Sequence, residues 1–164
     1  MLETSMRILA IDPGFDRCGV AILEYAAGKE VLLFSTCIMT DKTATLPHRL
    51  ATIGTALETI IAEHKPTALG IETLFFNKNI TTGIGVAQAR GVVLYIAEGH
   101  GLTIYEHGPQ EVKVAVTGYG NSDKTAVYAM IQRLVPNIPK KALDDEYDAI
   151  AVGITTLAQH GRNR

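Results

Sequence analysis

Residues that favour β-strands dominate the first quarter of the chain and fall into three apolar segments. Turn-like sequences separate these segments, notably Asp12-Pro13-Gly14 and the stretch 26–29. The pattern predicts an antiparallel three-stranded meander over residues 7–11, 19–25 and 30–39.

The spacing of apolar residues then changes from that of a strand to that of a helix. Between residues 46 and 65 the apolar positions fall on one helical face, with Pro47 suited to the first turn and Pro66 ending the helix. Later segments are predicted as strands over 68–72 and 102–106 and as helices over 80–99, 109–116, 122–135 and 145–160. The order predicts an α/β fold with a mixed sheet, helices on its faces and later strands that run parallel.

Acidic residues stand where three of these apolar elements end or begin. Asp12 follows the first predicted strand, Glu72 ends the fourth, and Asp145 and Asp148 share one face at the start of the last helix. Carboxylate oxygens from separate segments are the ligands that hard divalent cations require. The pattern therefore points to metal-dependent phosphodiester chemistry, in which two cations activate water and neutralise the charge of the phosphate.

Each acid also has a simpler structural explanation. Asp12 before Pro-Gly suits a turn, Glu72 could be a charge at the end of a strand, and Asp145 or Asp148 suits a helix start. Together these explanations leave open why the apolar strand 68–71 ends in a carboxylate.

The composition fits one domain over residues 6–164, with residues 1–5 interpreted as a vector remnant. Of the 164 residues, 47% are hydrophobic and 20% are charged. No stretch is expected to reach membrane-spanning length and no signal peptide is recognised, so we expect a cytoplasmic protein. The net charge of −2 argues mildly against DNA binding. Setting the four candidate acids aside, however, leaves 13 acids against 15 Lys and Arg residues.

Four motifs, in this order, resemble those of the RuvC family of Holliday junction resolvases, which have a ribonuclease H-like fold. They are Ile11-Asp-Pro-Gly14, the stretch 70–79 (GIETLFFNKN), Ala87-Gln-Ala-Arg-Gly91, and Asp145 with Asp148-Ala-Ile-Ala151. The resemblance implies a mixed five-stranded sheet with helices on both faces. It also implies a homodimer that nicks two strands of a four-way DNA junction symmetrically, in recombination and repair.

The resemblance also assigns roles to individual residues. Asp12, Glu72, Asp145 and Asp148 match the acids that bind two Mg²⁺ ions, with Mn²⁺ able to substitute. DNA contacts are expected from a second set of residues: Phe75, which matches an aromatic that stacks on a base, and Lys78, Arg90, Lys113 and Lys124. Whether RuvA and RuvB are partners stays open.

Several alternatives remain at this point. Asp144 competes with Asp145 as a ligand, and we prefer Asp145 and assign Asp144 to the helix N-cap. Phe76 competes with Phe75 for the stacking role. A YqgF-type nuclease, an actin-like ATPase or sugar kinase, and a catalytically silent junction-binding scaffold are the alternative functions. The stretch 118–125 lacks the pattern of a nucleotide P-loop. Gly83, Gly85 and Gly91 in a predicted helix indicate a close approach of another element, for which a dimer interface is one explanation.

Overall fold

The computed structural model describes residues 5–73 and 80–161. Its first three strands, β1 (Arg7–Asp12), β2 (Arg17–Ala26) and β3 (Lys29–Met39), form the predicted antiparallel meander. Ala27 (φ 51°) and Gly28 (φ 80°) connect β2 to β3. Positive φ at both residues is the conformation of a tight type I′ hairpin turn, whose twist matches that of the strands.

Two helix crossovers then add parallel strands on the other side of β1. The elements are α1 (Leu46–His64), β4 (Ala68–Glu72), α2 (Ile80–Gly99) and β5 (Thr103–His107). The Thr45 side chain caps α1 by accepting from the His48 amide, and Lys65 ends the helix in the left-handed region. β4 pairs in parallel with both β1 and β5, which gives the sheet order β3-β2-β1-β4-β5. The predicted mixed five-stranded sheet is confirmed.

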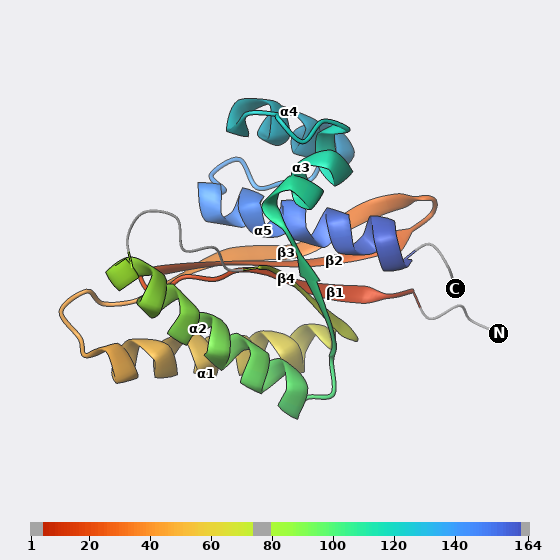
Figure 1. Ribbon diagram of the computed structural model, residues 1–164. Coiled ribbons are helices and arrows are strands. Elements are labelled where there is room, and N and C mark those ends of the chain that lie inside the picture. Colours follow the sequence, from red (N-terminus) through yellow and green to blue (C-terminus); the bar gives the residue numbers. More distant parts are fainter. Residues whose placement is uncertain (1–4, 74–79, 162–164) are drawn as a thin grey trace.

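The remaining helices are α3 (Pro109–Thr117), α4 (Lys124–Leu134) and α5 (Asp144–Thr156), and a π-helical turn, η1 (Leu157–Gly161), continues α5. Figure 1 shows α1 and α2 on one face of the sheet and α3, α4 and α5 on the other. The expectation of helices on both faces is therefore correct.

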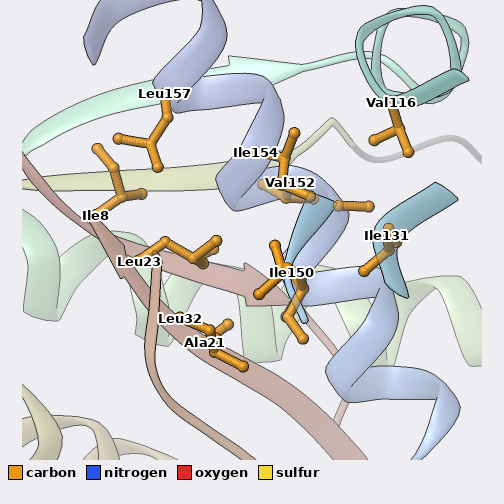
Figure 2. Packing of buried hydrophobic residues seen from close by; sticks show 14 of the residues in the cluster. Ile8, Ala21, Leu23, Leu32, Val116, Ile131, Ile150, Val152, Ile154 and Leu157 are labelled. Atoms are coloured by element: carbon orange, nitrogen blue, oxygen red, sulfur yellow. The ribbon is translucent and has the colours of Figure 1, made fainter. Parts of the chain in front are cut away.

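Alternate residues of the central strands supply two separate cores. Ile8 and Ala10 of β1 pack with α5, whereas Leu9 and Ile11 pack with α1 and α2. Successive side chains of a strand point to opposite faces, so a central strand that is covered on both sides must be apolar throughout. Figure 2 shows the first core, where Ile150, Ile154 and Leu157 of the α5–η1 segment lie over β1 and β2.

The glycine at position 85 of α2 is explained by a contact within this chain, so it does not require a dimer interface. A Cβ at Gly85 would lie 2.4 Å from the Phe15 ring, whereas one at Gly91 would meet open space. The close approach predicted from these glycines is thus, at Gly85, a contact with the loop that follows β1.

The helix α2 corrects one expectation about membranes. Among the described residues it alone is long and apolar enough, by length and composition, to cross a bilayer. The sequence had been expected to contain no stretch near that length. A helix that packs inside a compact fold passes the same test, so this is weak support for a membrane span.

Candidate active site

Asp12 stands at the carboxyl end of β1, immediately after four buried residues, and is itself half-buried. The pKa of its carboxyl is raised to about 8, mainly by burial and then by the charges of Asp148, Asp145 and Glu72 in that order. Nearby like charges act in this way because they disfavour the ionised form. Carboxylates of the three predicted segments therefore gather around Asp12.

Glu72 reaches the same edge of the sheet because β4 runs parallel to β1. Ile11 pairs with Ile71, so the residues that follow them, Asp12 and Glu72, lie at neighbouring strand ends. Burial raises the pKa of Glu72, Asp148 adds to this rise, and Lys113 opposes it. Parallel strands thus explain how two acids distant in sequence come together.

The third group of carboxylates, Asp145 and Asp148, comes from the N-terminal part of α5. A Cβ at Gly19 would lie 2.0 Å from the carbonyl oxygen of Asp145, so the glycine lets this end of the helix approach β2. Glu146 is buried, and its carboxylate accepts from the Ser35 hydroxyl and from the Leu143 amide, each at 2.8 Å. These contacts hold the first turn of α5 against the sheet.

The assignment of Asp144 to the N-cap is wrong by one residue. Leu143 occupies the N-cap position, Asp144 is the first helical residue, and the orphan Leu143 amide is satisfied by Glu146. An apolar N-cap was not predicted because the sequence rule favours a polar side chain there. Asp144 is exposed, and Asp145 rather than Asp144 is among the charges that raise the pKa of Asp12.

Asp145 and Asp148 of α5 each contact cations or hydroxyl groups from other elements. Arg17 Nη2 of β2 lies 2.5 Å from Asp145 Oδ2. Lys124 Nζ of α4 lies 3.4 Å from Asp148 Oδ2, and the Tyr128 hydroxyl donates to Asp148 Oδ1 at 3.0 Å. Hydrogen bonding to Tyr128 and the charge of Asp148 raise the pKa of Lys124, so its ammonium stays protonated.

A pocket of about 320 Å³ opens beside the acids, between α3, α4 and α5. Glu72, Asp148, Lys113 and Lys124 line it together with Tyr128, and apolar side chains complete the wall: Val112, Val127, Ala151 and Val152. The structure thus places two of the three predicted DNA-binding lysines, Lys113 and Lys124, beside the acidic cluster.

Other predicted DNA contacts have different positions. The Arg90 guanidinium pairs with Glu106 at 2.7 Å and donates to the Glu72 carbonyl oxygen at 3.4 Å, and its side chain is mostly buried. In this position Arg90 supports the end of β4. Phe75, Phe76 and Lys78 lie outside the described residues.

The chemistry of this cluster fits divalent metal. The donors are carboxylate oxygens, which Mg²⁺ and Mn²⁺ prefer, and a cation among them would relieve the repulsion that acts on Asp12. Within residues 5–73 and 80–161, no three potential ligands lie close enough together to hold one ion. The cluster has the composition of a metal site, while Asp145 and Asp148 are turned toward Arg17, Lys124 and Tyr128.

The sheet order and the helices on both faces define a ribonuclease H-like protein, with carboxylates at the neighbouring ends of β1 and β4. A family model described as "Crossover junction endodeoxyribonuclease RuvC" matches residues 8–156. The chain belongs to the RuvC family.

Individual relatives agree with this assignment. The crossover junction endodeoxyribonuclease RuvC of Heliobacterium modesticaldum is 43% identical over 151 residues, covering 91% of this chain and 92% of that protein. The RuvC of Clavibacter michiganensis is 40% identical over 162 residues, covering 97% of this chain and 79% of the relative. The structure of T. thermophilus RuvC in complex with Holliday junction substrate matches with a TM-score of 0.85 and 26% identity, over 92% of both chains.

Two residues of the site, Arg17 and Tyr128, were missed in the sequence. Tyr128 follows Lys124 by four positions in a predicted helix, so the two could have been placed on one face. Nothing in the sequence pairs Arg17 with Asp145, because that contact depends on how closely α5 approaches β2 at Gly19.

Proposed function

We propose that this chain is a structure-selective endonuclease that resolves Holliday junctions in recombination and repair, with Asp12, Glu72, Asp145 and Asp148 as its active-site acids. The observation that carries the proposal is the convergence of charge on Asp12, whose pKa of about 8 reflects burial and three neighbouring carboxylates. Without a bound cation, the carboxylates of such a cluster repel one another. Divalent cations that bind there relieve this repulsion and can assist phosphodiester hydrolysis. Membership in the RuvC family supports this assignment.

The four acids are proposed to hold two Mg²⁺ ions, with Mn²⁺ able to replace them. When bound, the ions supply an activated water and neutralise charge on the attacking and leaving oxygens. Because Asp145 now faces Arg17, we infer that metal loading competes with this ion pair for the carboxylate. Arg17, whose side chain is 45% exposed, is then free to turn toward a phosphate.

Lys113 and Lys124 are proposed to hold the scissile strand. Both line the pocket that contains Glu72 and Asp148, and ammonium groups at this place can neutralise phosphates on either side of the cleaved bond. Phe75, Lys78 and Arg90 stay as predicted DNA contacts, with Phe75 stacking on a base near the centre of the junction.

Symmetric cleavage of two strands requires two active sites, so the chain is proposed to act as a homodimer in the cytoplasm. Ile80, Ile84 and Tyr95 of α2 are large apolar or aromatic side chains that are well exposed, which suits a surface covered by a second copy. Participation of RuvA and RuvB is an open part of the proposal.

Strand-specific labelling of a synthetic four-way junction tests the function. In Mg²⁺ the protein is expected to nick two opposite strands at symmetric positions and to yield nicked duplexes that ligase can seal. A linear duplex with the same sequence is the matched control. Equal cleavage of the duplex, or nicks confined to one strand, would contradict junction resolution by a dimer.

A further inference from the structure

Tyr128 connects α4 to the carboxylate of Asp148. Its hydroxyl lies 3.0 Å from Asp148 Oδ1 and 3.3 Å from the carbonyl oxygen of Asp144. A phenol carries one hydrogen, so it donates fully to one acceptor at a time, and the shorter contact is the one to the carboxylate. The hydroxyl thus fixes one of the two oxygens of a proposed metal ligand.

The ring of Tyr128 is itself held in place. It stacks on Tyr147 with ring centroids 4.7 Å apart and planes inclined by 28°, and Lys124 Nζ lies 5.5 Å from its centroid. Tyr147 is fixed in turn, because its hydroxyl accepts from Gln132 Nε2 at 3.0 Å. These contacts restrict the Tyr128 ring. The position of its hydroxyl is therefore set by the stack and not by the rotation of the Asp148 carboxylate.

The two oxygens of Asp148 have different partners. Oδ1 accepts from Tyr128, while Oδ2 lies 3.4 Å from Lys124 Nζ. The exposed lysine can leave for a DNA phosphate, whereas the stacked tyrosine stays. After that exchange Oδ2 would be open to a cation, and Oδ1 would still be held by the hydroxyl.

We propose that Tyr128 is a positioning residue, which orients the Asp148 carboxylate so that Oδ2 faces the metal. This assignment rests on the proposed function, because it gives Asp148 a metal to bind. Hydrogen-bond partners of metal ligands commonly change metal affinity or activity by about 10- to 100-fold when they are removed. Tyr128 acts through Asp148 and need not touch the substrate.

The chain offers a matched pair of variants. Tyr128→Phe removes the hydroxyl that contacts Asp148 and keeps the stacked ring. Tyr147→Phe removes a hydroxyl from the partner ring, which contacts Gln132 rather than an active-site acid. Both variants should keep the melting temperature near that of the wild type, so that differences in metal binding are not caused by unfolding.

Mn²⁺ binding without DNA, followed by electron paramagnetic resonance, is the first measurement. Tyr128→Phe is expected to weaken binding by about tenfold, and Tyr147→Phe to leave it unchanged. The second measurement is junction cleavage as a function of Mg²⁺, in which Tyr128→Phe should raise the half-saturating concentration far more than it lowers the rate at saturation.

The outcomes separate this inference from the proposed function. If the wild type binds Mn²⁺ and cleaves junctions while Tyr128→Phe matches it in both assays, the positioning role is overturned and the proposed function stands. Equal losses in the Phe variants of Tyr128 and Tyr147 would also overturn the role, by assigning the effect to the aromatic stack. A wild type that neither binds Mn²⁺ nor cleaves would overturn the proposed function, and this assignment with it.

Discussion

Asp12 is an acid of the site whose ionised form is strongly disfavoured. It ends a strand whose preceding residues are buried, and three other acids act on it. Its pKa rises from 3.8 to about 8, first through burial and then through Asp148, Asp145 and Glu72. A raised pKa means that the folded chain holds a proton that the unfolded chain has already lost.

This difference sets the pH dependence of stability without metal. Below about pH 4, Asp12 is protonated in both states, so burial of the neutral carboxyl costs least. As pH rises from 4 to 8, the unfolded state releases the proton first and the free energy of unfolding falls. Urea unfolding in EDTA should therefore show Asp12→Asn gaining stability relative to the wild type over this range, with the difference levelling above pH 8. A constant difference from pH 4 to 8 would contradict the shift.

Asp144 and Asp145 differ in their predicted roles. Asp145 is half-buried and acts on Asp12, whereas Asp144 is exposed in the first turn of α5. We expect Asp145→Asn to abolish junction cleavage while junction binding persists. Asp144→Asn should keep cleavage and cost at most about 0.3 to 1 kcal/mol through the helix dipole, as measured by urea unfolding. An inactive Asp144→Asn beside an active Asp145→Asn would reverse the assignment.

The sequence predicted the acids better than their partners. An acid at the end of an apolar strand, such as Glu72, can be recognised from the sequence alone. The contact of Arg17 with Asp145 and that of Tyr128 with Asp148 join separate elements, so they depend on the distance between packed surfaces. Local pattern carries no information about that distance.

At the scale of elements, the N-terminus of α5 positions two of the proposed active-site acids, Asp145 and Asp148. Glu146 accepts from Leu143 in its own helix cap and from Ser35 in β3, so one carboxylate sets both the start of the helix and its place on the sheet. The sequence showed an excess of acids here without distinguishing this structural acid from the others. Its burial distinguishes it.

Glu146→Ala is therefore expected to destabilise the protein more than a surface substitution does. The change leaves the half-buried Leu143 amide and Ser35 hydroxyl without these acceptors, so the cost is expected toward the lower end of the range of about 1 to 3 kcal/mol for a buried unsatisfied group. Urea unfolding at neutral pH measures the loss. Ser35→Ala is the control that removes one of the two bonds, and it should cost less. A stability of Glu146→Ala equal to that of the wild type would show that α5 is held by its apolar face alone.

Most element boundaries were predictable because Pro, Gly and polar turns mark them. The predicted strand 68–72 and helix 80–99 coincide with β4 and α2. The predicted helix 122–135 begins two residues too early, because the Asp123 side chain caps α4, which starts at Lys124. The predicted last helix continues as a π-helical turn, a change in hydrogen bonding that side-chain periodicity does not reveal.

For the whole molecule, the topology followed from the order of elements. A meander and two helix crossovers permit few arrangements, and the observed sheet places β1 and β4 side by side. That adjacency brings Asp12 to Glu72 and makes one edge of the sheet acidic. Lys113 and Lys124 stand across the adjoining pocket, so DNA is expected to approach from the side of α3 and α4.

The salt dependence of junction binding tests this approach. Lys113→Ala and Lys124→Ala should each reduce the slope of log affinity against log salt by about one unit, because each removes one proposed phosphate contact. Lys29→Ala, in the hairpin at the opposite end of β2, should leave the slope unchanged. Fluorescence anisotropy with Ca²⁺ in place of Mg²⁺ measures binding, on the expectation that Ca²⁺ does not support cleavage. Unchanged slopes for both pocket lysines would place the DNA elsewhere.

The most direct test of the active site is single-turnover cleavage of a synthetic four-way junction, with Mg²⁺ or EDTA, by the wild type and by Asp12→Asn, Glu72→Gln and Asp148→Asn. We predict cleavage by the wild type only with Mg²⁺, no detectable cleavage by the three variants, and junction binding by all four proteins. Cleavage in EDTA, or near wild-type rates in any variant at saturating Mg²⁺, would contradict the assignment of these acids to a metal-dependent nuclease site.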